Sequence, residues 1–189
     1  MFPQKKYRLV DLSETIVPGQ VYGPLQDKRR CEIRPFTFHP GETMHEIDME
    51  SHIGTHLEVP SHFMEPRYGR PGKDVSQVPL ESLIGEAVLI NLSSAEPRKA
   101  ITQEDLEKEG IRKGDIVLIG NSPYKGEERP WLTAEAAWWL ARRGIKMLGF
   151  DRTVQVEDPT KPKALENYAT HDAMLSNDIP FIECLANLG

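Results

Sequence analysis

The sequence predicts a mixed α/β or α+β fold in which helices accompany a partly parallel sheet. In the second half of the chain, short aliphatic runs alternate with segments that carry helix-capping residues, as expected of βαβ units. In the first third, strand-like runs follow one another without a helix between them, so a mixed, swivelled sheet arrangement fits. The length of 189 residues suits one core, and we expect residues 1–189 to form a single domain.

The N-terminal elements are predicted to be strands followed by a loop. Tyr7 to Leu12 and Cys31 to Phe38 read as strands. Glu65 to Pro79 is rich in proline and glycine, which leaves no room for a regular element. We expect a long surface loop there, of the kind that often borders a functional site.

The second half is predicted to alternate strands with helices. Thr102 is an N-cap candidate and Gly110 ends the first helix, while Gly144 ends the second. A continuous apolar run between the helices suits a strand covered on both faces. The predicted elements are strand Ala87 to Ile90, helix Thr102 to Glu109, strand Asp115 to Gly120, helix Thr133 to Arg143 and strand Ile145 to Phe150.

Composition and charge narrow the classes of function. The formal net charge of −6 and the pI of about 5.6 provide no basic stripe for phosphates, so we expect no nucleic-acid partner. No apolar run is long enough for a signal peptide or a membrane span, and we expect a cytoplasmic protein without a membrane partner. Cys31 and Cys184 lie far apart without metal-binding spacing, so we expect reduced thiols.

One cluster of chemistry-bearing residues lies between Glu50 and His62 and holds three histidines and two glutamates. An extended strand would spread its donors over roughly 33 Å, too far to share one ion. A helix would align His52 with His56 but would turn Glu58 to the opposite side. We therefore expect the segment to bend, and its single glycine and single proline supply the places.

Once bent, the segment suits a catalytic metal site. Two neutral imidazoles and one carboxylate form a three-ligand set that leaves a position open for water. A divalent cation lowers the pKa of bound water and polarises a carbonyl, which favours hydrolysis of an amide, ester or lactone. His62 then suits a proton shuttle. His39 and His45 are each isolated in the sequence, and we interpret them as ordinary surface or core histidines without a metal role.

The cluster carries a recognisable motif, which reads His52-x-Gly54-Thr55-His56-x-Glu58-x-Pro60-x-His62. It resembles the HxGTHxDxPxH signature of the cyclase-like metal-dependent hydrolases, which include bacterial kynurenine formamidase and isatin hydrolase. Further matches extend the resemblance over nearly the whole chain. They are Asp11 to Ser13, Gly114 to Leu118, Leu132 to Leu140, Gly149 to Asp151, His171, and Ile182 to Leu188.

The resemblance implies a swivelling β/β/α fold and hydrolysis of a carbon–nitrogen or related acyl bond in a small molecule. It implies a centre with one or two divalent metal ions, zinc or manganese, in which His52, His56 and Glu58 ligate the first ion. His171 and Glu183 would complete a second metal position, and His62 would be the catalytic acid/base. Members of this family are commonly oligomers, so a homodimer or homotetramer is expected.

Three features depart from the family pattern. Glu58 stands where the family has aspartate, and its side chain is one methylene longer. Val154 and Val156 occupy places where the family often has serine and aspartate. The chain stops at Gly189, where family members usually continue, so a shortened sequence or a lost element is expected.

These departures keep a second hypothesis open. A degenerate relative would retain the fold and use its pocket to bind a small molecule without catalysis, whereas the intact histidine set favours the enzyme. A third interpretation, a stacking platform at Trp138 and Trp139, is weaker, because an aromatic pair on an alanine-rich helix more often packs in a core or an interface.

Overall fold

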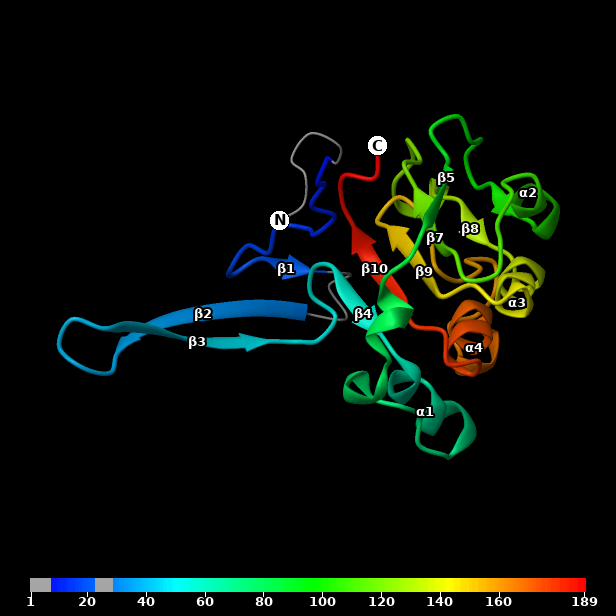
Figure 1. Ribbon diagram of the computed structural model, residues 1–189. Helices are drawn as coiled ribbons and strands as arrows, with labels where there is room; N and C mark the ends of the chain where they lie inside the picture. The colour runs from blue at the N-terminus through cyan, green and yellow to red at the C-terminus, as the bar shows by residue number, and fades with distance from the viewer. Residues whose placement is uncertain (1–7, 23–28) are drawn as a thin grey trace.

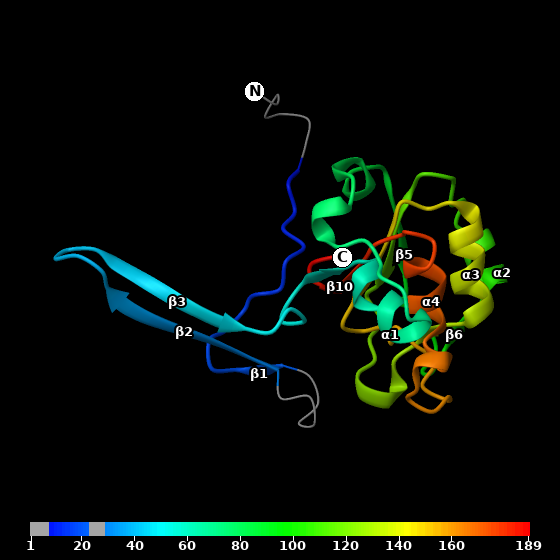
Figure 2. The same ribbon diagram turned by 90° about the horizontal axis from the view of Figure 1, so that it is seen from below.

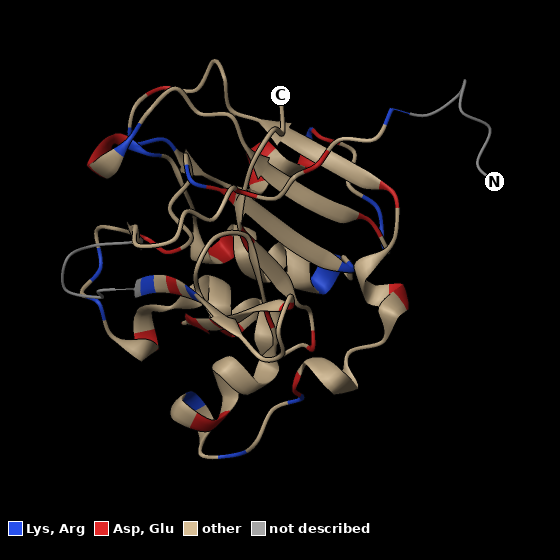
Figure 3. Ribbon diagram, turned by 90° about the vertical axis from the view of Figure 1, so that its left-hand side faces the viewer, with Lys and Arg blue, Asp and Glu red and all other residues tan. Residues whose placement is uncertain are grey.

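The computed structural model describes residues 8–22 and 29–189, and a five-stranded sheet lies at its centre (Figure 1). The strand order is β4-β10-β9-β7-β5, in which β4 runs antiparallel to β10 and the other neighbours are parallel. The strands are β4 (His56–Glu58), β5 (Ala87–Asn91), β7 (Ile116–Gly120), β9 (Met147–Asp151) and β10 (Phe181–Leu185). These strands carry little charge, and acidic and basic residues lie mainly in the surrounding segments (Figure 3).

Three helices cover one side of this sheet (Figure 2). They are α2 (Gln103–Glu107), α3 (Ala134–Arg143) and α4 (Ala169–Leu175), and α3 packs against both of the others. The Thr133 side chain accepts a hydrogen bond from the backbone N–H of Ala136 at the start of α3, and Gly144 ends the helix at a φ of 74°. Local sequence therefore sets both ends of the longest of these helices.

The main core lies between the sheet and the helices. Ala136, Ala137 and Leu140 on α3 belong to this core, and their side chains are fully buried. Burial of such apolar side chains is the dominant stabilising contribution of the domain. The largest buried side chains in this layer include Phe63, Ile119, Leu140, Leu148, Phe150 and Phe181.

A hairpin arm extends away from the main body (Figures 1 and 2). It consists of β2 (Arg29–Thr37) and β3 (Thr43–Met49), paired antiparallel, with the short β1 (Val21–Tyr22) on β2. Every residue of β3 is exposed. A second small sheet pairs β6 (Ala100–Ile101) with β8 (Trp131–Leu132) in parallel.

Short helical segments complete the described chain. Helix α1 (Met64–Tyr68) follows the histidine motif at residues 52–62. Turns of 3-10 helix lie at η1 (Pro60–His62), η2 (Val75–Gln77), η3 (Leu80–Leu83), η4 (Gly126–Glu128) and η5 (Leu165–Asn167). No helix formed by the described residues combines the length and apolarity needed to cross a membrane.

The predicted mixed fold with a partly parallel sheet is confirmed, and the strands and helices predicted beyond residue 80 are present with slightly different ends. The prediction of a loop without regular structure from Glu65 to Pro79 is wrong, because α1 extends into this segment and η2 forms within it. Pro66 lies in the first turn of α1, where a helix needs no donor from it, and Gly69 ends the helix at a φ of 63°.

The prediction of a strand from Tyr7 to Leu12 is also wrong over residues 8–12, while Tyr7 lies outside the described residues. Leu12 accepts one backbone hydrogen bond, from Ala186 N at 2.9 Å, just beyond the end of β10. A single bond of this kind does not make a strand ladder.

Candidate metal centre

The histidine motif at residues 52–62 reaches the sheet through two bends. Gly54 adopts a φ of 66°, and a Cβ placed there would lie 2.8 Å from the Ile16 side chain, so glycine is suited to this turn. The chain then forms β4, whose pairing with β10 sets Glu183 directly opposite His56. The bend at Gly54 and the antiparallel pairing thus bring together residues more than a hundred positions apart.

The second bend places His62. Pro60 begins the turn η1, and the backbone N–H of Ser61 donates to the Lys73 carbonyl at 2.9 Å. A Cβ at Gly72 would overlap the backbone carbonyl of Pro60, so only glycine allows the two segments to approach this closely. This contact holds His62 at the end of η1, next to the carboxylate of Glu58.

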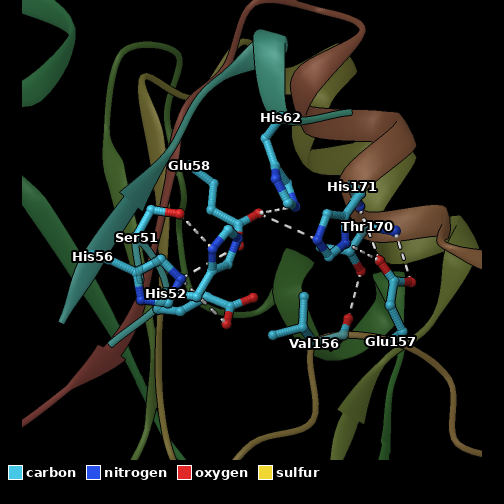
Figure 4. A network of polar contacts seen from close by, with 10 residues as sticks. Ser51, His52, His56, Glu58, His62, Val156, Glu157, Thr170 and His171 are labelled. Carbon is cyan, nitrogen blue, oxygen red and sulfur yellow. Dashed lines mark hydrogen bonds and ion pairs between the residues drawn. The ribbon is translucent and has the colours of Figure 1, made fainter. Parts of the chain in front are cut away.

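Four imidazoles converge on that carboxylate (Figure 4). Oε1 of Glu58 lies 3.2 Å from Nε2 of His52 and 3.4 Å from Nε2 of His56. Oε2 lies 3.2 Å from Nε2 of His171 and 3.7 Å from Nε2 of His62. The two carboxylate oxygens therefore face two different pairs of histidines.

Glu183 lies at the edge of this cluster. Its Oε2 is 3.9 Å from Nε2 of His56, its partner in the β4–β10 register. Two groups of donor atoms come within 4.8 Å of one another, the first of His52, His56 and Glu58, and the second of Glu58, His62 and His171. Glu58 belongs to both groups.

The ring nitrogens that face away from Glu58 have partners that orient the imidazoles. Nδ1 of His56 lies 2.9 Å from the Gly54 carbonyl, and Nδ1 of His52 lies 2.9 Å from Oγ of Ser51. With Nδ1 occupied by such partners, Nε2 is the nitrogen directed at the centre, as is common for metal-binding histidines.

His171 has the most elaborate support. Oε1 of Glu157 accepts from the backbone N–H of His171 at 3.0 Å and lies 2.7 Å from its Nδ1. Oε2 of Glu157 accepts from the backbone N–H of Thr170 at 3.1 Å, and the Thr170 hydroxyl donates to the Val156 carbonyl at 2.7 Å. These bonds tie the start of α4 to the segment after β9 (Figure 4).

The cluster retains its negative charge on Glu58. Burial raises the pKa of this carboxyl, but its contacts with His171, His52 and His56 outweigh burial and hold the pKa well below its usual range. For His56, burial lowers the pKa of the imidazole. Its contacts, among them those with Cys184 and Glu58, outweigh burial and raise that pKa to about 10. A buried carboxylate of this kind calls for a compensating positive charge.

The remaining groups respond to burial in opposite ways. Burial lowers the pKa of His171, but Glu157 and Glu58 raise it to about 10. Burial and then the charge of Glu58 raise the pKa of Glu183, whereas burial lowers the pKa of His62.

The residues present fit a divalent cation. Nε2 of His56 and Oε2 of Glu58 are buried and make no hydrogen bond to any described residue. Metal–ligand bonds of about 2.0–2.2 Å place neighbouring donors of a tetrahedral site roughly 3.3–3.6 Å apart. The distances from Glu58 Oε1 to the two imidazoles, 3.2 and 3.4 Å, are close to that spacing.

The structure brings together all six residues that the sequence singled out, namely His52, His56, Glu58, His62, His171 and Glu183. His39 and His45 lie exposed on the hairpin arm, outside the cluster. Sequence reasoning missed Glu157, because no local pattern links it to a histidine fourteen residues later.

The cluster opens into a cavity of about 570 Å³, a size suited to a small molecule. Val154 and Val156 line it together with Tyr168, so the departure from the family pattern gives the cavity an apolar wall. Arg129, Lys161 and Lys163 also line this cavity. Trp138 and Trp139 do not line it and pack instead against the main core.

The chain is similar to known proteins in sequence and in fold. Residues 10–157 match the model of the Cyclase family, described as "Putative cyclase". A kynurenine formamidase of Erythrobacter litoralis (strain HTCC2594) is 29% identical over 185 residues, covering 94% of this chain and 79% of that relative. A kynurenine formamidase of Bacillus thuringiensis (strain Al Hakam) is 31% identical over 144 residues, covering 72% of this chain and 62% of the relative.

The fold has solved counterparts as well. Isatin hydrolase A from Labrenzia aggregata superposes with a TM-score of 0.74 at 23% identity, covering 96% of this chain and 81% of that one. Since the family model matches residues 10–157, which include the histidine motif, the chain belongs to the cyclase family of metal-dependent hydrolases.

Proposed function

We propose that the protein is a metal-dependent hydrolase that cleaves the carbon–nitrogen or related acyl bond of a small amide, lactone or ester. The observation that carries this proposal is the convergence of four imidazoles on the buried carboxylate of Glu58 at the floor of a cavity. The similarity to kynurenine formamidases and to an isatin hydrolase supports an amide as the bond cleaved.

His52, His56 and Glu58 would hold the first metal ion, and His171 with Glu183 would complete a second position that shares Glu58. A divalent ion bound there polarises a carbonyl and lowers the pKa of water. Zinc and manganese both suit two imidazoles and a carboxylate. One ion would fit the first donor group, and a second ion would take Glu58 and His171 from the second group without His62. Glu58 anchors both groups, because each of its oxygens meets a different pair of imidazoles.

His62 is assigned as the acid/base that moves protons to and from the reacting group. Its side chain is 39% exposed, against 8% for His56, so it reaches furthest toward the cavity. Its Nε2 also lies the furthest of the four imidazoles from the Glu58 carboxylate, at 3.7 Å. A proton shuttle needs access to both substrate and solvent, which this position provides.

The rival function is binding of a small molecule without catalysis. Val154 and Val156, which line the cavity, are the observation in its favour, because they provide no polar group where relatives often have one. The longer side chain of Glu58 is not an obstacle to the enzyme, since its carboxylate still meets all four imidazoles.

Chelation and elemental analysis test the proposal. We expect the purified protein to contain zinc or manganese and to hydrolyse an aryl formamide, to lose that activity on chelation, and to regain it when the ion is restored. His56→Ala should lower both metal content and rate, because two donors bind an ion too weakly. The exposed His45→Ala is the matched control. Full turnover by metal-free protein would refute the proposal, and stoichiometric metal without turnover would favour the binder.

We also propose that the protein forms a homodimer or homotetramer in which the hairpin arm contacts another copy. Ile33, Phe36, Met44 and Ile47 on the arm are 39–62% exposed, and a two-stranded hairpin is only marginally stable by itself in water. Light scattering on wild type and Ile47→Lys tests this idea. A monomeric wild-type protein would contradict it.

Two further proposals concern the whole chain. Residues 1–189 are proposed to act as one domain, which is consistent with a site whose parts extend from Ser51 to Glu183. A cytoplasmic location is proposed because Cys31 and Cys184 are both free thiols. Limited proteolysis and cell fractionation test these proposals.

A further inference from the structure

Arg129 occupies an unusual position in the cavity of the candidate centre. It lies between η4 and β8 and lines the same cavity as His52, Glu58 and His62. Its Nε donates to the Gly126 carbonyl at 2.9 Å, and its Nη1 donates to the carbonyls of Arg152 and Val154 at 3.2 and 3.3 Å. Neutral backbone groups therefore fix the guanidinium in place.

This guanidinium has no ion-pair partner among the described residues. Within residues 8–22 and 29–189, no acidic side chain lies within ion-pair distance of Arg129, and Nη2 makes no hydrogen bond. The neighbouring Arg152 differs, since Glu14 holds it through two bonds of 2.6 Å. Burial, and then the charge of Arg152, lower the pKa of Arg129, as expected of a partly desolvated cation without an anion.

The acidic residues of the cavity already have partners. Glu58 and Glu183 belong to the histidine cluster, and Glu157 accepts from His171 and Thr170. Asp158 accepts from the backbone and the hydroxyl of Thr160 at 2.8 and 2.7 Å. Each of these acids therefore has partners other than Arg129 in this structure.

Two more cations line the same cavity. Lys161 and Lys163 follow β9, and neither has a carboxylate partner among the described residues. An anion that entered the cavity would meet three cations, one of which is held by three backbone carbonyls and keeps two donors on Nη2 that bond to no described residue. An arginine held in this way is suited to give a carboxylate a charge-assisted hydrogen bond from Nη2.

We propose that Arg129 is a specificity-determining residue that binds a carboxylate on the substrate, away from the bond that is cleaved. The inference rests on the proposed hydrolase function and names its substrate class, a small acyl compound that is anionic at neutral pH. Lys161 and Lys163 contribute by attracting the anion toward the cavity. Arg129 takes no part in the bond cleavage itself.

The test compares charged and neutral probes of the same shape on the full chain as purified. Calorimetry measures the dissociation constants of benzoate and benzamide for wild type, Arg129→Met, Arg129→Lys and Arg142→Met. Arg142 is exposed on α3 and is the matched control for loss of an arginine. Any carboxylate contact with a bound metal is common to all four proteins, so the ratio of the two constants isolates Arg129.

We expect the preference for benzoate over benzamide to fall by about tenfold to hundredfold in Arg129→Met. The reason is that a hydrogen bond between charged groups contributes most of this preference in wild type. Arg129→Lys should retain part of the preference, and Arg142→Met all of it. A folded Arg129→Met or Arg129→Lys protein with the full wild-type preference would overturn the proposal. Thermal unfolding checks the folding of each variant, and the lysine variant serves if the methionine variant does not fold.

Hydrolysis assays distinguish a failure of the role proposed for Arg129 from a failure of the proposed hydrolase function. The same variants are assayed with 2-formamidobenzoate and 2-formamidobenzamide, and kcat/KM is compared for the pair. Failure to cleave either compound would count against the hydrolase function, while the calorimetric ratio would still decide the role of Arg129. Equal cleavage of both compounds by wild type, with no binding preference, would overturn the anionic substrate class.

Discussion

Replacing Glu157 with glutamine is the most informative single change to the candidate centre. Glu157 contacts no residue of the motif at 52–62 by hydrogen bond, yet its two oxygens accept from both Thr170 and His171. The substitution preserves size and removes one acceptor oxygen. It therefore asks whether the orientation of His171 depends on this carboxylate.

The expected loss of stability follows from counting the hydrogen-bond donors that face Glu157. The glutamine oxygen can face His171, which leaves the amide group against the backbone N–H of Thr170. It can instead face Thr170, which leaves the amide group against two donors of His171. Either arrangement leaves at least one part-buried donor without an acceptor, at a cost of about 1–3 kcal/mol. For a domain of this length the melting temperature should fall by about 2–12 °C.

The second arrangement also changes the tautomer of His171, because Nδ1 must then accept and Nε2 must carry the proton. A protonated Nε2 cannot ligate a metal ion, so affinity should fall by about tenfold to hundredfold. Thermal unfolding and metal titration by calorimetry measure both effects. The exposed Glu166→Gln, which removes the same charge, is the control. Wild-type melting temperature and metal affinity in Glu157→Gln would refute the reasoning.

Four further changes have defined outcomes. Gly72→Ala should destabilise the protein by about 1–3 kcal/mol in denaturant unfolding, because the added Cβ overlaps the Pro60 carbonyl; unchanged stability would contradict that contact. His62→Ala should keep its metal, by elemental analysis, while the rate falls by about 10² to 10⁴, and loss of metal would make His62 a ligand instead. Glu58→Asp should retain metal with an altered rate, whereas metal-free protein would show that the longer side chain is required. Leu140→Ala, at a fully buried position, should cost about 2–5 kcal/mol, and a cost below that range would mean that the core closes around the gap.

Local chemistry made much of the fold predictable. Thr133 and Gly144 bound α3 where the sequence predicts it, because capping and a left-handed C-terminus depend only on neighbouring residues. The two bends of the motif were predictable for the same reason, from Gly54 and Pro60. Pro66 misled the prediction, since proline breaks a helix interior but is tolerated in its first turn.

The alternation of strands and helices, the bends of the motif and the donor types for a metal ion could all be predicted from the order of the residues. Three features depend on tertiary packing: Glu183 lies opposite His56, Glu157 orients His171, and Arg129, which has no ion-pair partner among the described residues, lines the same cavity. Capping, bending and donor chemistry act between neighbours along the chain. Pairing of β4 with β10 and docking of α4 depend instead on how distant segments pack, which no local pattern specifies.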